Sequence, residues 1–85
     1  RSGSLVKVPA GTVARLRSRG APLRAVVIQG NLAYRQPKKA TRQTLAPGSY
    51  FRSTGSAEHG VACAAGRDCL LYVHAGGRFD VLPAR

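Results

Sequence analysis

Glycine and proline residues divide this chain into short segments, and this division is the strongest constraint on its fold. Ten glycines and five prolines are spread along 85 residues, and they separate short runs of apolar and β-branched side chains. No helical pattern of more than two turns occurs, and no internal repeat is found. A chain of 85 residues forms one domain with a modest core, which closure into a barrel would protect. The sequence therefore predicts an all-β fold.

Eight segments have the length and patterning of β-strands. They are residues 5–9, 12–19, 23–29, 32–35, 49–53, 59–63, 69–75 and 78–82. Residues 23–29 are the most hydrophobic and predict a central strand, with Gly30 and Asn31 as the turn into a hairpin partner at 32–35. Gly76 and Gly77 predict the last hairpin turn. Residues 36–43 are polar and basic and predict an exposed loop or edge. Residues 1–4 are set aside as an appended or linker segment, which leaves 5–85 as the domain.

The net charge of +11 limits the classes of partner. Fourteen Lys and Arg stand against three Asp and Glu, and such an excess attracts polyanions over a Debye length of about 8 Å. It also keeps a small protein soluble. Lys38, Lys39 and Arg42 form the clearest basic cluster, so nucleic acid is a candidate partner, although no recognised nucleic-acid motif accompanies them. No segment approaches the apolar length of a membrane span, and we expect no membrane partner.

The first of two glycine-framed segments carries a family resemblance. Gly11 and Gly30 enclose Arg17, Arg19 and Leu23 at regular spacing. This spacing resembles the first cupin motif, in which the three inner positions hold two histidines and a glutamate that bind metal. Arginine and leucine cannot supply those ligands. The resemblance therefore implies a cupin-type barrel that has lost most of its metal site.

The second glycine-framed segment supports the same family. Gly48, His59 and Cys63 fall on the glycine, histidine and asparagine positions of the second cupin motif, so one ligand of four is kept. Over residues 5–83 the chain resembles the small ChrR-type cupin domains. The resemblance implies a double-stranded β-helix, or jelly roll. Cupin barrels commonly pair, so we expect a homodimer, and we expect a cytoplasmic location.

The direction of the two arginines in the first motif is open. Strict alternation along residues 12–19 turns Ala14, Leu16 and Ser18 to the core, whereas cupin geometry turns Arg17 and Arg19 into the barrel mouth. Two buried guanidinium groups without partners would cost several kcal/mol each. The inward arrangement therefore requires water, a carboxylate or a bound anion.

The cysteines and histidines give no complete reactive site. Cys63 and Cys69 flank a loop of hairpin size that permits a disulfide, whereas a cytosolic protein would keep both reduced. Similar small cupins carry both cysteines, which implies a structural pair. His59 and Cys63 could form a pair of zinc ligands, but a complete shell would require Cys69 or His74 to converge on them, and the spacing does not demand that. No catalytic thiol or general acid/base pair is identified, and deliberate substitution of the ligands in an engineered variant is conceivable.

These observations favour a metal-free, degenerate cupin barrel that binds or senses a small anion and needs no cofactor. Arg17 and Arg19 would clamp the acidic group of the ligand. The predicted pocket lining consists of Leu23, Val27, Tyr34, Phe51 and His59. The alternatives are an interaction or regulatory module and a basic nucleic-acid-binding protein. A metal-dependent cupin enzyme is the least favoured interpretation.

Overall fold

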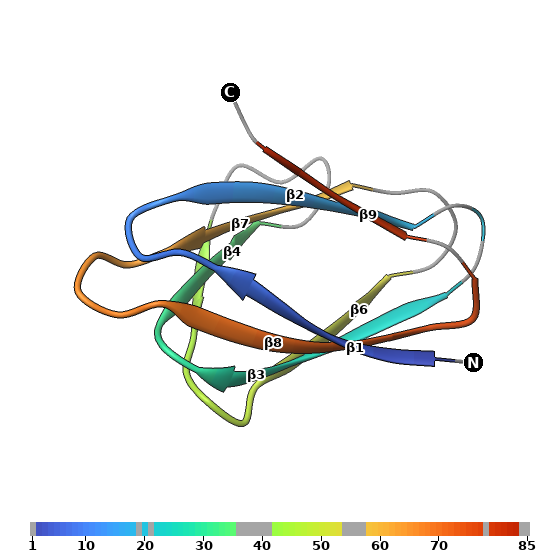
Figure 1. Ribbon diagram of the computed structural model, residues 1–85, viewed down its shortest axis with the longest axis horizontal. Helices are drawn as coiled ribbons and strands as arrows, with labels where there is room; N and C mark the ends of the chain where they lie inside the picture. The colour runs from blue at the N-terminus through green and yellow to red at the C-terminus, as the bar shows by residue number, and fades with distance from the viewer. Residues whose placement is uncertain are drawn as a thin grey trace.

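The chain is all-β, as the sequence predicts. A computed structural model describes residues 2–18, 20, 22–35, 42–53, 58–77 and 79–83. Over these residues the strands form two antiparallel sheets that lie face to face (Figure 1). No described helix is long and apolar enough to cross a membrane.

Nine strands make up the two sheets in the described part of the chain. The first sheet has the order β1 (Ser2–Val8), β8 (Cys69–Ala75), β3 (Leu23–Gln29) and β6 (Tyr50–Ser53). The second has the order β5 (Gln43–Leu45), β4 (Leu32–Arg35), β7 (Glu58–Cys63), β2 (Val13–Ser18) and β9 (Phe79–Pro83). β1 begins at Ser2, so residues 2–4, which the sequence analysis set aside, pair with β8.

The predicted hairpins are wrong. β3 and β4 lie in different sheets, as do β8 and β9, so the turns at Gly30 and at Gly76 carry the chain from one layer to the other. The physical reason is that each strand has one apolar face, and two such faces are buried by stacking sheets rather than by extending one sheet. Gly30 has a φ of 89°, which favours glycine at this crossing.

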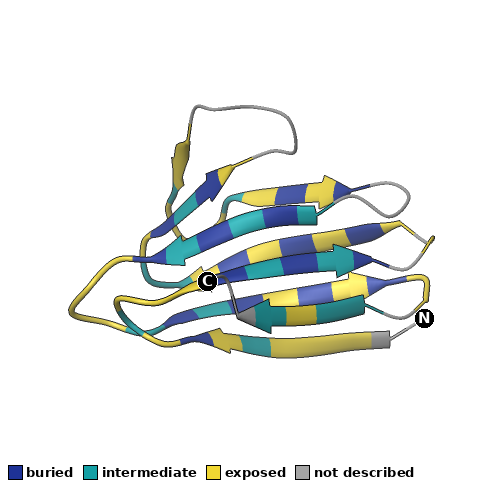
Figure 2. Ribbon diagram, turned by 90° about the horizontal axis from the view of Figure 1, so that it is seen from above, coloured by how far each residue is buried: buried dark blue, intermediate teal, exposed yellow. Residues whose placement is uncertain are grey.

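Alternating side chains fill the space between the sheets, and Figure 2 shows the alternation as bands of buried and exposed residues along the strands. Leu16, Leu23, Leu32 and Leu71 are each at most 1% exposed. They come from β2, β3, β4 and β8, so both sheets contribute to the core. This interior supplies most of the apolar burial that stabilises the domain.

A disulfide joins Cys63 to Cys69. Cys63 ends β7 in one sheet and Cys69 begins β8 in the other, so the bond connects the two layers directly. The same end of the barrel holds a contact at Gly30, where an added Cβ would lie 2.7 Å from the Cys69 Sγ. The sheets are therefore cross-linked and closely packed at this end.

We expect removal of the disulfide to lower the free energy of unfolding by about 2 kcal/mol, because the unfolded chain regains the entropy of an open loop. Urea denaturation of the Cys63→Ala/Cys69→Ala double variant against the oxidised protein measures this change. Reduced wild-type protein is the matched control because it keeps both side-chain volumes. Equal stability of the oxidised and reduced proteins would contradict the prediction.

Candidate ligand-binding site

Three stacked rings lie between the sheets. Tyr34 comes from β4, Phe51 from β6 and His59 from β7, and they are 3%, 6% and 5% exposed. The Tyr34 and Phe51 ring centroids are 4.3 Å apart with planes inclined by 23°, and the His59 ring lies 5.6 Å from that of Tyr34. These three residues belong to the predicted pocket lining. The structure brings them together because each occupies an inward position in the alternation of its strand.

A hydrogen bond orients the imidazole in this stack. The Tyr34 hydroxyl lies 2.7 Å from the His59 Nδ1. A phenol donates readily, and donation into Nδ1 leaves the imidazole proton on Nε2. Nε2 is buried and has no hydrogen-bond partner among the described residues, and the same holds for the Ser53 Oγ. A buried polar atom without a partner costs about 1–3 kcal/mol, so these two atoms are a local cost to the fold.

Burial also controls the charge of the pair. It lowers the pKa of His59 from its ordinary value of 6.5 and raises the pKa of Tyr34 from its ordinary value of 10.0. Both shifts have one cause, since removal from water disfavours the charged form of each group. At neutral pH the pair is therefore an uncharged imidazole and an uncharged phenol.

A cavity of about 350 Å³ adjoins the ring stack. It is lined by Tyr34, Gln43, Leu45, Tyr50, Phe51 and Arg52. The cavity lies where β5, at the edge of one sheet, and β6, at the edge of the other, contribute side chains. Its size falls within the range of small-molecule sites. His59 does not line the cavity itself, but it contacts the two rings that do.

Four of the lining residues were not predicted. Gln43 was included in a loop or edge segment, and Leu45 carried no functional signal. Tyr50 and Arg52 occupy the outward positions of β6, and both are exposed. They reach the cavity only because β6 is the last strand of its sheet. Alternation within one strand carries no information about which strand forms an edge.

Arg17 lies outside the interior. Its guanidinium group contacts the Glu58 carboxylate at 3.6 Å and the Asp80 carboxylate at 3.9 Å, and its side chain is 41% exposed. Ala14, Leu16 and Ser18 are buried instead, which is the arrangement that alternation favours. Arg17 is thus not near the ring stack, because two carboxylates on neighbouring strands satisfy it at the surface.

The other predicted site residues divide into two groups. Leu23 and Val27 are each 1% exposed and pack in the hydrophobic core on the inner face of β3. Arg19, Lys38 and Lys39 lie outside the described residues. Arg42, the remaining member of the basic cluster, is exposed.

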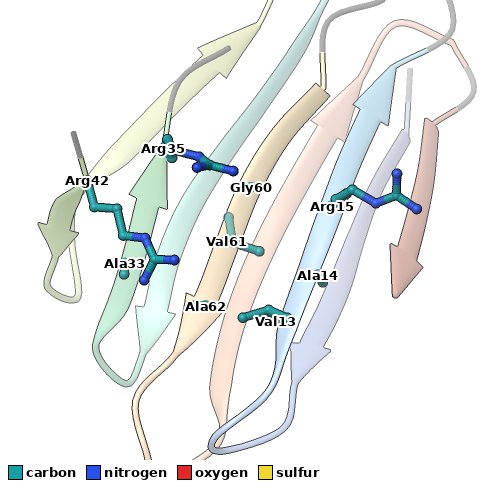
Figure 3. Close-up of a pocket in the computed structure, with 9 residues that line it drawn as sticks. All are labelled: Val13, Ala14, Arg15, Ala33, Arg35, Arg42, Gly60, Val61 and Ala62. Carbon is teal, nitrogen blue, oxygen red and sulfur yellow. The ribbon is translucent and has the colours of Figure 1, made fainter. Parts of the chain in front are cut away.

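A second, smaller hollow of about 180 Å³ lies on the outer face of the second sheet. Ala33, Ala62 and Val13 are in register across β4, β7 and β2, and Arg35, Gly60 and Arg15 form the next row. Figure 3 shows Arg35 and Arg42 extending over this hollow, while Arg15 turns toward β9. The Arg15 guanidinium lies 3.6 Å from the Glu58 carboxylate. Two arginines thus remain over an apolar floor.

The sequence matches one protein family over nearly its whole length. A model described as "Domain of unknown function (DUF4437)" covers residues 1–82. The chain belongs to the DUF4437 family. Among curated proteins, no sequence match to this DUF4437 chain is found.

Solved structures share the fold of this DUF4437 domain. An uncharacterized protein with a double-stranded β-helix domain from Klebsiella pneumoniae has a TM-score of 0.77 at 14% identity, covering 96% of this chain and 74% of its own. The Cnp3 cupin domain from Schizosaccharomyces pombe has a TM-score of 0.72 at 14% identity, and the match covers 96% of this chain and 52% of the Cnp3 chain. The polyketide cyclase RemF from Streptomyces resistomycificus has a TM-score of 0.73 at 17% identity, and the match covers 98% of this chain and 59% of the RemF chain.

These similarities confirm the predicted cupin-type fold. The identities are all below 20%, so the comparison establishes the fold alone. The chain spans only 52% and 59% of the Cnp3 and RemF chains. The narrower ChrR-type assignment stays a prediction.

The residues around His59 do not fit the metal that many cupins bind. No group of three or more His, Cys, Asp or Glu side chains is present in the described part of the DUF4437 domain. The Nδ1 of His59 is engaged by Tyr34, and the ring neighbours of the imidazole are Tyr34 and Phe51. Cys63 and Cys69 are joined to each other. One imidazole nitrogen is too few for a stable site.

The depressed pKa of His59 predicts a loss of stability in acid. Unfolded His59 takes up a proton as the pH falls below 6.5, while the folded protein resists protonation until a lower pH. This contribution is therefore absent above pH 6.5 and increasingly destabilising below it, until the pH falls below the folded pKa. Urea denaturation across this range should show a steeper loss for the wild type than for His59→Gln. Equal pH dependence in the two proteins would contradict the prediction.

Proposed function

We propose that this domain binds a small amphipathic anion in the cavity beside the Tyr34, Phe51 and His59 rings, without a metal. The observation that carries the proposal is the cavity itself, which has the Tyr34 and Phe51 rings as its wall and the Arg52 and Gln43 side chains in its lining. His59 does not line the cavity, but its Nδ1 lies 2.7 Å from the Tyr34 hydroxyl, and this hydrogen bond fixes the Tyr34 ring in the cavity wall.

The apolar part of the ligand would contact the aromatic wall. Tyr34 and Phe51 present adjacent rings to the cavity, and Leu45 faces it from β5. Aromatic side chains offer a large contact area with specific stacking geometry. This lining favours a flat, ring-containing molecule over a small inorganic ion.

The acidic part of the ligand would contact Arg52, with the Gln43 amide as a second donor. Arg52 is exposed and has no ion-pair partner within the described ranges of the chain. The three acidic residues are engaged elsewhere, Glu58 and Asp80 with Arg17, and Asp68 with Lys7. Arg52 thus takes the anion-binding role that the sequence analysis gave to Arg17 and Arg19.

The proposal is tested by thermal denaturation with 1-naphthoate and with the neutral 1-naphthamide as probes. We expect naphthoate at low millimolar concentration to raise the melting temperature more than sodium chloride of equal ionic strength, and more than naphthamide. Arg52→Gln should weaken naphthoate binding by at least about tenfold, because a hydrogen bond between charged groups is lost, and should leave naphthamide unchanged.

Arg35→Gln is the matched control, since it removes the same charge from the opposite sheet. Naphthoate binding that is lost in Arg35→Gln and kept in Arg52→Gln would place the anion site in the outer hollow and contradict the proposal. A melting temperature that no aromatic carboxylate raises above the effect of sodium chloride would also contradict it.

A further inference from the structure

A row of exposed apolar side chains crosses all four strands of the first sheet on its outer face. Leu5 pairs with Tyr72, Tyr72 with Val26, and Val26 with Tyr50. Their exposed fractions are 67%, 42%, 39% and 68% in the order Leu5, Tyr72, Val26 and Tyr50. An antiparallel sheet commonly leaves one face to water, but that face is then mostly polar. This row therefore needs an explanation beyond folding.

Tyr72 leans along the sheet instead of standing away from it. A Cβ added to Gly3 would overlap the hydroxyl and ring atoms of Tyr72, so the ring occupies the space above this glycine. Gly3 pairs with His74, two residues further along β8. The absence of a side chain at residue 3 thus lets the ring lie over the outer face of the sheet, where 42% of Tyr72 is exposed.

The neighbouring row on the same face is cationic. Arg24 pairs directly with Arg52 on one side and with His74 on the other. Like charges opposite each other destabilise a sheet, and neither arginine has an ion-pair partner among the residues described. All three acidic residues of the chain form ion pairs elsewhere. An external anion is the group that would relieve this repulsion.

We propose that the outer face of β1, β8, β3 and β6 binds single-stranded nucleic acid. Unpaired bases stack on exposed aromatic rings, with about 1–3 kcal/mol per base, and Tyr50 and Tyr72 supply two rings two strand spacings apart, or about 10 Å. Arg24 and Arg52 lie in the next row, where they contact phosphates. A duplex hides its base faces, so this surface selects single strands.

Charge favours a polyanion over a second copy of this chain as the occupant. Each chain carries a net charge of +11, and two copies joined through this face would bring Arg24 and Arg52 of both chains together. A nucleic acid neutralises the same arginines and releases counterions on binding. The apolar row alone would suit either occupant, and the cationic row decides between them.

Two residues of this surface lie outside the proposed small-molecule cavity. Tyr50 and Arg52 border both, whereas Tyr72 and Arg24 belong to the outer face alone. Tyr72→Leu therefore tests the nucleic-acid surface and leaves naphthoate binding unchanged. Failure of one proposal can thus be told from failure of the other.

The experiment measures fluorescence anisotropy of labelled oligothymidylate and oligouridylate of about 15 nucleotides, and of a duplex of the same length. We expect both single strands to bind more tightly than the duplex at near-physiological salt. The ratio of the oligothymidylate affinity to the oligouridylate affinity shows whether DNA or RNA is preferred. Tyr72→Leu should weaken binding at least about fivefold because a stacked base is lost, and Tyr72→Phe should restore it because the ring remains.

Arg24→Gln should weaken binding and lower the salt dependence by about one phosphate contact. Arg35→Gln, which removes an equal charge from the opposite sheet, should have a smaller effect. Gly3→Ala, which displaces the Tyr72 ring without changing charge, should weaken binding as Tyr72→Leu does. Unfolding curves matched to the wild type establish that the variants are folded.

Three results would overturn the proposal. One is equal affinity for duplex and single strands. Another is equal loss in Arg24→Gln and Arg35→Gln with no effect of Tyr72→Leu, which would indicate attraction by net charge alone. The third is a Tyr72-dependent dimer in sedimentation experiments without nucleic acid, which would assign the face to a second copy.

Discussion

Burial of alternate side chains between two sheets is the constraint on which the rest of this structure depends. Most of the described strands are short and bury alternate side chains, so no single sheet of these strands could hide that face on its own. Leu16 and Leu32 from one sheet pack in the same core as Leu23 and Leu71 from the other. The chain therefore changes layers at its turns, and the position of every outward side chain follows from that arrangement.

The same two-layer arrangement places the arginines of the two sheets in different electrostatic surroundings. Arg15 and Arg17 face outward on β2, next to Glu58 and Asp80 on the flanking strands, and ion pairs compensate part of their charge. Such exposed pairs contribute little to stability, but they occupy two of the three carboxylates. The first sheet has no acidic residue in its strands. Its arginines consequently retain their full attraction for anions.

The sequence was sufficient for the fold class, and three of the residues that it suggested lie together in the candidate site. Alternation and turn residues predict most of the strands, and the second cupin-like segment places His59 inside the barrel. Tyr34 and Phe51 follow from the inward positions of their own strands. The direction of Arg17 could not be predicted, because local alternation and the cupin motif indicated opposite faces. Two surface carboxylates and the cost of burying a guanidinium group turn this side chain outward. Pairing between distant strands determines which strands are neighbours in a sheet and which residues lie at the cavity rim. The local sequence around Gln43 and Arg52 therefore does not predict that they line the cavity.

The disulfide between Cys63 and Cys69 adds a covalent cross-link to one end of the barrel. It fixes one end, and hydrogen bonds such as that from the Gln29 side chain to the Asp68 carbonyl lie at the same end. His59 and Ser53 lie toward the other end of their strands, away from this cross-link. The chain itself passes from one sheet to the other at that end, after β2, β6 and β8, so covalent connections join the layers there as well. The two layers are therefore held covalently at both ends, and access to the cavity depends on the edge strands β5 and β6 rather than on separation of the sheets.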